Sequence, residues 1–167
     1  MQIFTYPVFW KFVYRYANLI ITPFLLLYGL SLVTLIDKSL IMILPLIIAF
    51  ILLYVLNKSY LEFYKIVPYK IEADEEKIVC SQFLFRNKTV TIYIKDIDSL
   101  SGGIFSGKYR GVMRVSDGKN KIIIGFFDKM KNSTKLVTLL LSKVDKKIYD
   151  DVIENIQSIK IGSELKK

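Results

Sequence analysis

Two uncharged apolar segments decide the fold: ANLIITPFLLLYGLSLVTLI at residues 17–36 and SLIMILPLIIAFILLYVLN at residues 39–57. Only Asp37 and Lys38 separate them. An α-helix rises about 1.5 Å per residue, so roughly 20 apolar residues cross the ~30 Å hydrocarbon core of a bilayer. A cleaved signal peptide has a shorter apolar stretch and a small-residue cleavage site. The pattern therefore predicts a retained transmembrane hairpin of two helices.

The basic residues that flank the two segments indicate how the hairpin is oriented. Lys11 and Arg15 precede the first segment, and Lys58, Lys65 and Lys70 follow the second. The connecting turn carries only Lys38. Lys and Arg are enriched in short cytoplasmic flanks, so we expect a multi-pass protein of the cell inner (cytoplasmic) membrane with both termini in the cytoplasm.

The interiors of the two segments contain prolines but no Asp, Glu, Lys or Arg. Pro45 is expected in the middle of the second span, where it would free the carbonyl of Ile41 and bend the helix. Charged groups inside a membrane commonly mark ion or proton pathways. Their absence from both segments argues against a transporter or pump that acts alone.

The sixteen residues before the first span are rich in aromatic rings. Tyr and Trp favour the level of the lipid headgroups, which predicts an interfacial belt. The alternative is a surface on which another membrane subunit docks. The residues expected at the interface or at such a docking surface are Phe9, Trp10, Tyr14 and Tyr16.

After residue 66 the pattern changes to short strands separated by turns. Thr89–Ile94 alternates apolar and polar residues, as a half-buried strand does. Asp117-Gly118 lies between two apolar runs and predicts a hairpin. About six or seven antiparallel strands are expected, including those at residues 68–72, 77–85, 89–94, 111–115 and 121–127.

The chain ends with two amphipathic helical patterns. Leu136, Leu140 and Val144 repeat at helical spacing in the first. A second helix is expected from Lys146 to about Lys160, and its apolar stripe contains Ile148, Val152, Ile156 and Ile159. Both stripes are interpreted as core packing.

These patterns predict an α+β membrane protein in five parts. The expected parts are an interfacial aromatic segment (1–16), a transmembrane hairpin (17–57, with spans 17–36 and 39–57), a connector (58–66), a folded domain (67–144) and an additional C-terminal helix and tail (145–167).

Several stretches of the domain resemble bacterial pleckstrin-homology-like domains. The sequence PYKI at 68–71, followed by EEKI at 75–78, is similar to their opening hairpin, and TVTIYIKDIDSL at 89–100 is similar to a later strand. A Gly-rich turn, the Asp-Gly hairpin and the Leu-rich helix at 135–144 follow in the expected order. The resemblance implies a curled antiparallel sheet closed by a C-terminal helix, often preceded by a transmembrane hairpin. The helix after Lys146 departs from that pattern.

The chain offers few side chains for catalysis. It has no histidine and one cysteine, Cys80, which lies in a strand-like run and is interpreted as a buried apolar residue. Without histidine, the commonest general base and the commonest metal ligand are missing. The carboxylates cluster at expected turns, and no phosphate-binding or metal-binding motif occurs. We therefore expect no enzymatic activity, no cofactor and no metal site.

The formal net charge of +9 suits a surface that faces anionic lipid. The residues expected to contact lipid headgroups lie on two loops of the domain: Arg86, Lys88, Lys108 and Arg110. Ordinary solubilising charges are the alternative interpretation of the same four residues. Nucleic-acid binding is not expected, because no motif for it is present.

The sequence thus favours a non-enzymatic, membrane-anchored binding or scaffold protein. It would serve as an accessory subunit or adaptor of a larger inner-membrane complex. Its expected partners are the lipid bilayer and a membrane protein or further copies of itself. The alternative function is a sensor at the cytoplasmic face that reads anionic lipid through the basic loops.

Overall fold

A computed structural model describes residues 1–37, 39–83, 88–108 and 110–164, with side chains described up to residue 158. The chain divides into two compact units. One is a helical unit, Phe9–Lys65, and the other combines Met1–Val8 with Ile66–Lys167. The second unit is therefore built from both ends of the chain, and the helical unit is inserted between them in the sequence.

The helical unit contains α1 (Val8–Val33), the short 3₁₀ turn η1 (Leu40–Met42) and α2 (Ile43–Ile66). Both α-helices are long and apolar enough to cross a membrane. They extend beyond the expected spans, because α1 already begins at Val8 and α2 continues to Ile66. The connector expected at 58–66 is helical, as its Lys, Leu and Glu residues favour.

The prediction that Pro45 bends the second helix at its middle is wrong. Because α2 begins at Ile43, Pro45 lies in its first turn. Amide groups in the first turn of a helix have no acceptor within that helix, so a proline there costs no internal hydrogen bond.

The two long helices bury few of their residues and leave most of their apolar side chains exposed. Gly29, Leu32 and Ala49 are buried. Phe24 and Phe50, by contrast, are 69% and 56% exposed. So extensive an apolar surface exceeds what soluble monomers leave open to water and suits contact with lipid or another protein.

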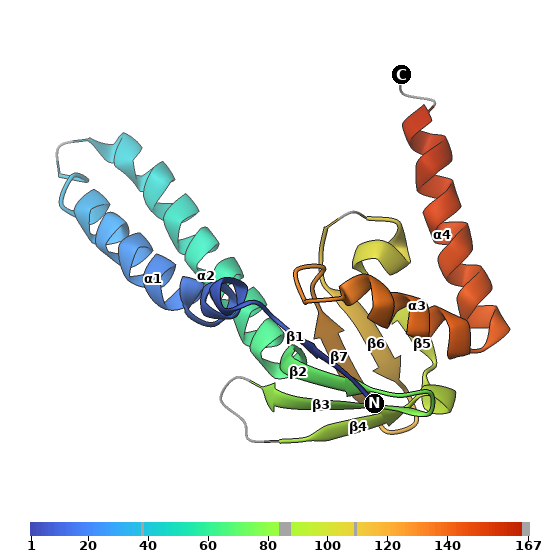
Figure 1. Ribbon diagram of the computed structural model, residues 1–167. Coiled ribbons are helices and arrows are strands. Elements are labelled where there is room, and N and C mark those ends of the chain that lie inside the picture. Colours follow the sequence, from blue (N-terminus) through green and yellow to red (C-terminus); the bar gives the residue numbers. More distant parts are fainter. Residues whose placement is uncertain (38, 84–87, 109, 165–167) are drawn as a thin grey trace. The chain divides into compact units, whose positions relative to one another are not determined.

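The second unit is an α+β fold with two antiparallel sheets (Figure 1). The four-stranded sheet has the order β1 (Gln2–Thr5), β2 (Pro68–Ala73), β3 (Lys77–Phe83) and β4 (Val90–Tyr93). The three-stranded sheet has the order β5 (Ser99–Ser101), β6 (Met113–Asp117) and β7 (Ile122–Phe126). The expected α+β class with about seven antiparallel strands is confirmed.

The single curled sheet that was expected is not observed, because the strands form two separate sheets. The ladder of the first sheet ends at β4, which has four residues and runs into the 3₁₀ turn η2 (Ile94–Asp96). The following strand, β5, has three residues and pairs with β6 instead. A short strand that leads into a tight turn offers too few backbone groups to continue the ladder.

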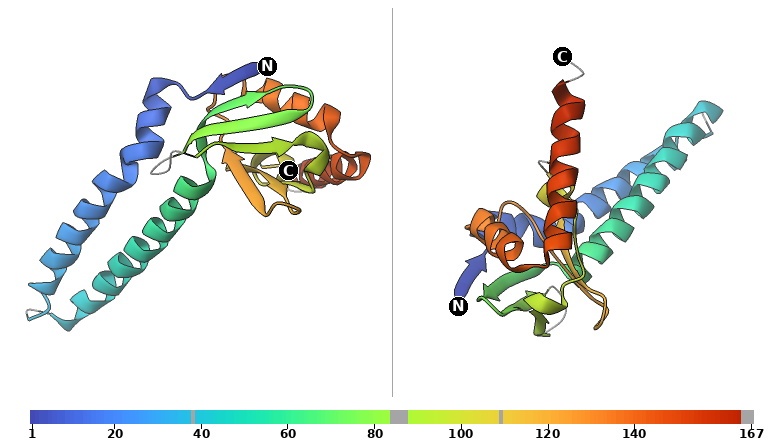
Figure 2. Two further views of the ribbon diagram at one scale, coloured as in Figure 1. Left: turned by 90° about the horizontal axis from the view of Figure 1, so that it is seen from below. Right: turned by 90° about the vertical axis from the view of Figure 1, so that its right-hand side faces the viewer.

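Residues before the first long helix belong to the α+β unit. Strand β1 pairs with β2 from Gln2↔Ala73 to Thr5↔Lys70 (Figure 2, left). Its side chains alternate, so that Ile3 is 59% exposed and Phe4 is 1% exposed. The segment 1–16, expected as one interfacial piece, thus divides into a strand and the start of α1.

Two further contacts fix this N-terminal segment to the C-terminal half of the unit. The backbone N–H of Phe127 donates to the hydroxyl of Tyr6 at 2.8 Å. The backbone N–H of Lys131 donates to the carbonyl of Thr5 at 2.9 Å. The folded domain therefore extends beyond the expected range 67–144 at its N-terminal side.

Two helices complete the unit, α3 (Ser133–Lys143) and α4 (Lys146–Glu164). Leu136 and Leu140 of α3 are buried, as their spacing predicted. Ile148 and Val152 of α4 are buried where this helix packs against β5 and η3 (Gly103–Ser106). Its last turns project beyond the two sheets (Figure 2, right). The side chain of Ile159 lies outside the described residues.

Candidate functional site

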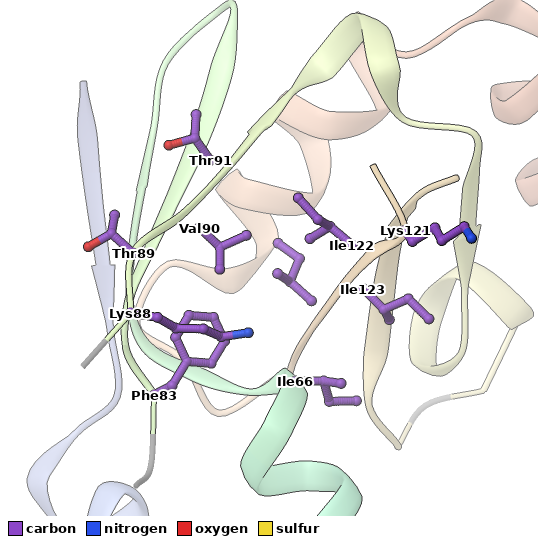
Figure 3. A pocket seen from close by; sticks show the side chains of 10 residues that line it. Ile66, Phe83, Lys88, Thr89, Val90, Thr91, Lys121, Ile122 and Ile123 are labelled. Atoms are coloured by element: carbon purple, nitrogen blue, oxygen red, sulfur yellow. The ribbon is translucent and has the colours of Figure 1, made fainter. Parts of the chain in front are cut away.

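A cleft of about 410 Å³ opens between the beginnings of β4 and β7 (Figure 3). It lies where the two sheets separate. Most of its lining is apolar and comes from the end of α2, the end of β3 and the two strands. The apolar residues of the lining are Ile66, Phe83, Val90, Ile122, Ile123 and Ile124.

Strand edges border this cleft on both sides. The lining includes the consecutive residues 88–91 and the consecutive residues 121–124. Side chains of a strand alternate between its two faces, so a run of consecutive lining residues means that the edge of the strand faces the cleft. Val90 and Ile122 point into the cleft, whereas Thr89 and Thr91 point away from it (Figure 3).

Neither edge has a strand partner on its outer side within the described parts of the chain. There, β4 pairs with β3 alone and β7 pairs with β6 alone. An open strand edge presents backbone N–H and C=O groups that can pair with another chain.

One lysine gives the cleft a positive charge. The ammonium of Lys88 lies 4.8 Å from the ring centroid of Phe83, a cation–π geometry. Lys121 also borders the cleft, directly before β7, but its side chain points away from it (Figure 3). The described residues of the lining include no Asp or Glu. The cleft is thus apolar, with the ammonium of Lys88 at its wall.

The structure brings together only part of the basic set expected to contact lipid. Lys88 lines the cleft, whereas Lys108 and Arg110 are exposed in the loop between η3 and β6 and do not line it. Arg86 lies outside the described residues. Lys121, which also borders the cleft, was not expected there from the sequence. It is the last residue of the turn 118–121 that precedes β7.

The aromatic residues expected at the membrane interface lie on the first turns of α1. Trp10 contacts Phe9 at 5.4 Å and stacks on Tyr14 at 5.7 Å, measured between ring centroids. Tyr16 lies instead 5.0 Å from Phe12. Ring contacts therefore join Phe9, Trp10 and Tyr14 along the helix, and they join Tyr16 to Phe12.

The end of α2 supplies further rings beside the start of α1. The hydroxyl of Tyr64 donates to the backbone carbonyl of Arg15 at 3.3 Å. Tyr60 packs against Phe63 at 6.1 Å and against Tyr64 at 5.9 Å. The two helices of the hairpin thus share an aromatic end.

Cys80 is placed in the core of the four-stranded sheet. Its side chain is fully buried, and this burial raises the pKa of the thiol to about 12. A thiol with such a pKa carries almost no thiolate at neutral pH and is not poised as a nucleophile.

The carboxylates with shifted pKa values accept hydrogen bonds within turns. Asp74 accepts hydrogen bonds from the backbone N–H groups of Glu76 at 3.0 Å and Lys77 at 2.9 Å, which lower its pKa. Asp117 accepts from the backbone and the side chain of Asn120 at 2.9 and 2.8 Å. Within the described residues, no three His, Cys, Asp or Glu side chains gather as metal ligands would.

Comparison of the chain with known protein families, with curated proteins and with solved structures gives no match. The functional argument therefore depends on the geometry of this chain. The two features that it offers are the pairing of β1 with β2 across the hairpin and the open cationic cleft between β4 and β7.

Proposed function

We propose that the protein is a non-enzymatic adaptor or accessory subunit of a larger inner-membrane complex. In this proposal α1 and α2 cross the bilayer, and the α+β unit stays at the cytoplasmic face with both termini. The observation that carries the proposal is the pairing of β1 with β2.

Strand pairing constrains how the chain can cross the membrane. Strand β1 precedes α1 with two residues between them, Tyr6 and Pro7, and Val67 alone separates α2 from β2. Two strands that share a ladder must lie on the same side of a bilayer. The chain between them therefore crosses an even number of times. The two candidate spans satisfy this condition as a hairpin.

The direction of the hairpin follows from charge. Lys11, Arg15, Lys58 and Lys65 flank the ends that connect to the α+β unit. This bias supports a cytoplasmic location for the unit. The short links on either side of the sheet would hold the unit at the membrane surface.

The pleckstrin-homology-like fold is part of this proposal. Its support is the run of short antiparallel strands, the Asp117-Gly118 turn between β6 and β7, and the following helix α3 with its buried leucines. Domains of one fold serve unrelated functions, so the fold by itself does not specify the partner.

An adaptor function is favoured over catalysis by the surfaces that the chain leaves open. The hairpin exposes a broad apolar surface, and Phe9 at its aromatic end is 67% exposed. Such surfaces are typical of sites where a membrane protein meets lipid or a partner. The buried thiol and the turn-forming carboxylates offer no group that is poised for chemistry.

A sensor of anionic lipid is the second candidate. Its support is that Lys88, Lys108 and Arg110 are all exposed. Each basic residue near an anionic surface contributes about 1 kcal/mol of attraction. The structure weakens this candidate in one respect, since Lys88 lines a cleft that the other two residues do not reach.

The test is gentle detergent extraction of tagged full-length protein, followed by mass measurement of the intact assembly. A stoichiometric heteromeric complex would support the adaptor. Phe9→Ala with Trp10→Ala should weaken that complex, whereas Phe24→Ala, which removes an equally exposed ring from the middle of α1, is the matched control. Recovery of the chain alone, together with binding to anionic vesicles that Lys108→Glu and Arg110→Glu abolish, would favour the lipid sensor.

A further inference from the structure

We propose that the cleft between β4 and β7 binds an extended, acidic segment of a partner polypeptide as an additional strand. This inference rests on the proposed adaptor function and names the kind of partner segment that the adaptor recognises. The cleft has no part in the proposed function as stated above. Three of its features support this inference: open strand edges, an apolar lining and a positive charge.

The first step concerns the backbone. Strand β4 presents its edge to the cleft at residues 90–91 and β7 at residues 122–124, and within the described chain no strand pairs with either edge there. An incoming strand would satisfy these N–H and C=O groups by β-augmentation. A hydrocarbon chain in the same place would remove water from them without offering hydrogen bonds, which is unfavourable. A peptide therefore fits this lining better than an acyl chain does.

The second step concerns the apolar side chains. Val90 and Ile122 point into the cleft from opposite walls (Figure 3). A strand presents side chains alternately to its two faces, so every second residue of the incoming segment would pack against this lining. The volume of about 410 Å³ lies within the range of sites that hold a bound ligand.

The third step concerns charge. The side chain of Lys88 points into the cleft (Figure 3), and the described lining residues include no carboxylate. The contact of Lys88 with the Phe83 ring holds its ammonium at the wall of the cleft. An acidic residue beside the apolar part of the incoming segment would complement this charge, and a basic residue would be repelled.

The experiment measures fluorescence anisotropy of a defined peptide with full-length protein in nanodiscs. The probe is the peptide EETITVTIEE carrying a fluorescent label, and empty nanodiscs give the background. Two comparison peptides are KKTITVTIKK, with the charge reversed, and EETIPVPIEE, in which prolines prevent strand pairing. The proposal predicts saturable binding of the probe and at least tenfold weaker binding of both comparison peptides.

Variants of the protein locate the binding. Lys88→Glu should weaken binding of the acidic probe at least tenfold and should favour the basic peptide. Lys135→Glu makes the same change of charge on an exposed residue of α3, so it should leave the affinity unchanged. The thermal unfolding of each variant shows that it is folded.

Three results would overturn the proposal: no saturable binding of the probe, equal binding of the proline peptide, or the same affinity after charge reversal in the cleft. Binding of oleate that Lys88→Glu abolishes, with no binding of the peptide, would assign the cleft to an anionic amphiphile instead. None of these outcomes depends on membrane topology or on co-purification of a partner. Failure of this inference can therefore be distinguished from failure of the proposed function.

Discussion

The side-chain amide of Asn18 donates to the side-chain carbonyl of Asn57 at 2.9 Å and joins α1 to α2 near one end of the hairpin. The hydroxyl of Thr22 donates to Asn18 at 3.2 Å, and the amide of Asn57 donates to the Leu53 carbonyl at 2.9 Å. Polar contacts between otherwise apolar helices fix which residues face one another. This network therefore sets the register of the two helices.

Removal of Asn57 should loosen the hairpin. We expect a double-mutant cycle of Asn18→Ala and Asn57→Ala to give a coupling of about 0.6 kcal/mol, and at most about 1.7 kcal/mol, as for other hydrogen bonds between membrane helices. The measurement is reversible unfolding in mixed detergent micelles. Ser31→Ala is the control, because the Ser31 hydroxyl bonds to Leu27 within its own helix. If the two substitutions changed the free energy of unfolding in a strictly additive way, the hydrogen bond between Asn18 and Asn57 would be contradicted.

Substitution of Phe4 tests whether the N-terminal strand belongs to the folded α+β unit. Phe4 is 1% exposed, so Phe4→Ala should cost roughly 3–5 kcal/mol of stability. Ile3→Ala, one residue earlier on the exposed face of β1, should change stability by no more than about 0.5 kcal/mol. Thermal unfolding of the full chain provides the comparison. Equal effects of the two substitutions would mean that β1 does not pair as described.

Asp117 should make stability depend on pH in acid. The side-chain and backbone hydrogen bonds from Asn120 hold the pKa of Asp117 below its usual value. The unfolded chain, with a pKa of about 3.9, therefore takes up a proton first as the pH falls. The stabilisation is complete above that pKa and is lost as the pH falls through the lower pKa of the folded state.

The measurement for Asp117 is the free energy of unfolding from about pH 6 down to about pH 3. Asn120→Ala removes the side-chain donor, so its curve should fall less steeply than that of the unchanged protein. Part of the slope should remain in this variant, because Asp74 also has a lowered pKa. An identical slope in the variant would contradict the assigned hydrogen bonds.

The buried thiol of Cys80 should not react with thiol reagents in the folded protein. Burial raises its pKa to about 12, and thiol reagents attack the thiolate. We expect no reaction with a maleimide at pH 8 in the native state and reaction of one thiol per chain in guanidinium chloride, since the chain has one cysteine. Native-state labelling at the rate of a free thiol would show that β3 is not buried.

The helices and most of the strands were predictable, because their signals are local. Uncharged runs long enough to cross a bilayer identified α1 and α2, and alternation identified β4. The Asp117-Gly118 pair identified the hairpin between β6 and β7, which forms with Asp117 paired opposite Ile122. Each of these signals is contained within a few neighbouring residues.

The remaining features depend on contacts between distant residues. Gln2–Thr5 reads as a strand only once its partner is known, and that partner lies beyond both long helices. Because many aromatic residues follow this strand, the whole segment 1–16 was interpreted as lying at the membrane interface. The cleft arises because the two sheets do not close, and Lys121 joins Lys88 there only through the path of the chain in space.

The most direct test of the account is the side of the membrane on which each part of the chain lies. Single cysteines would replace Gln2 in β1, Asp37 between the helices and Ser142 in α3, all of them exposed, and be probed in spheroplasts with a membrane-impermeant maleimide. The account predicts that only Asp37→Cys reacts in intact spheroplasts, and that Gln2→Cys and Ser142→Cys react after the membrane is opened. Labelling of Gln2→Cys and Ser142→Cys from opposite sides would contradict the hairpin and the pairing of β1 with β2 across it.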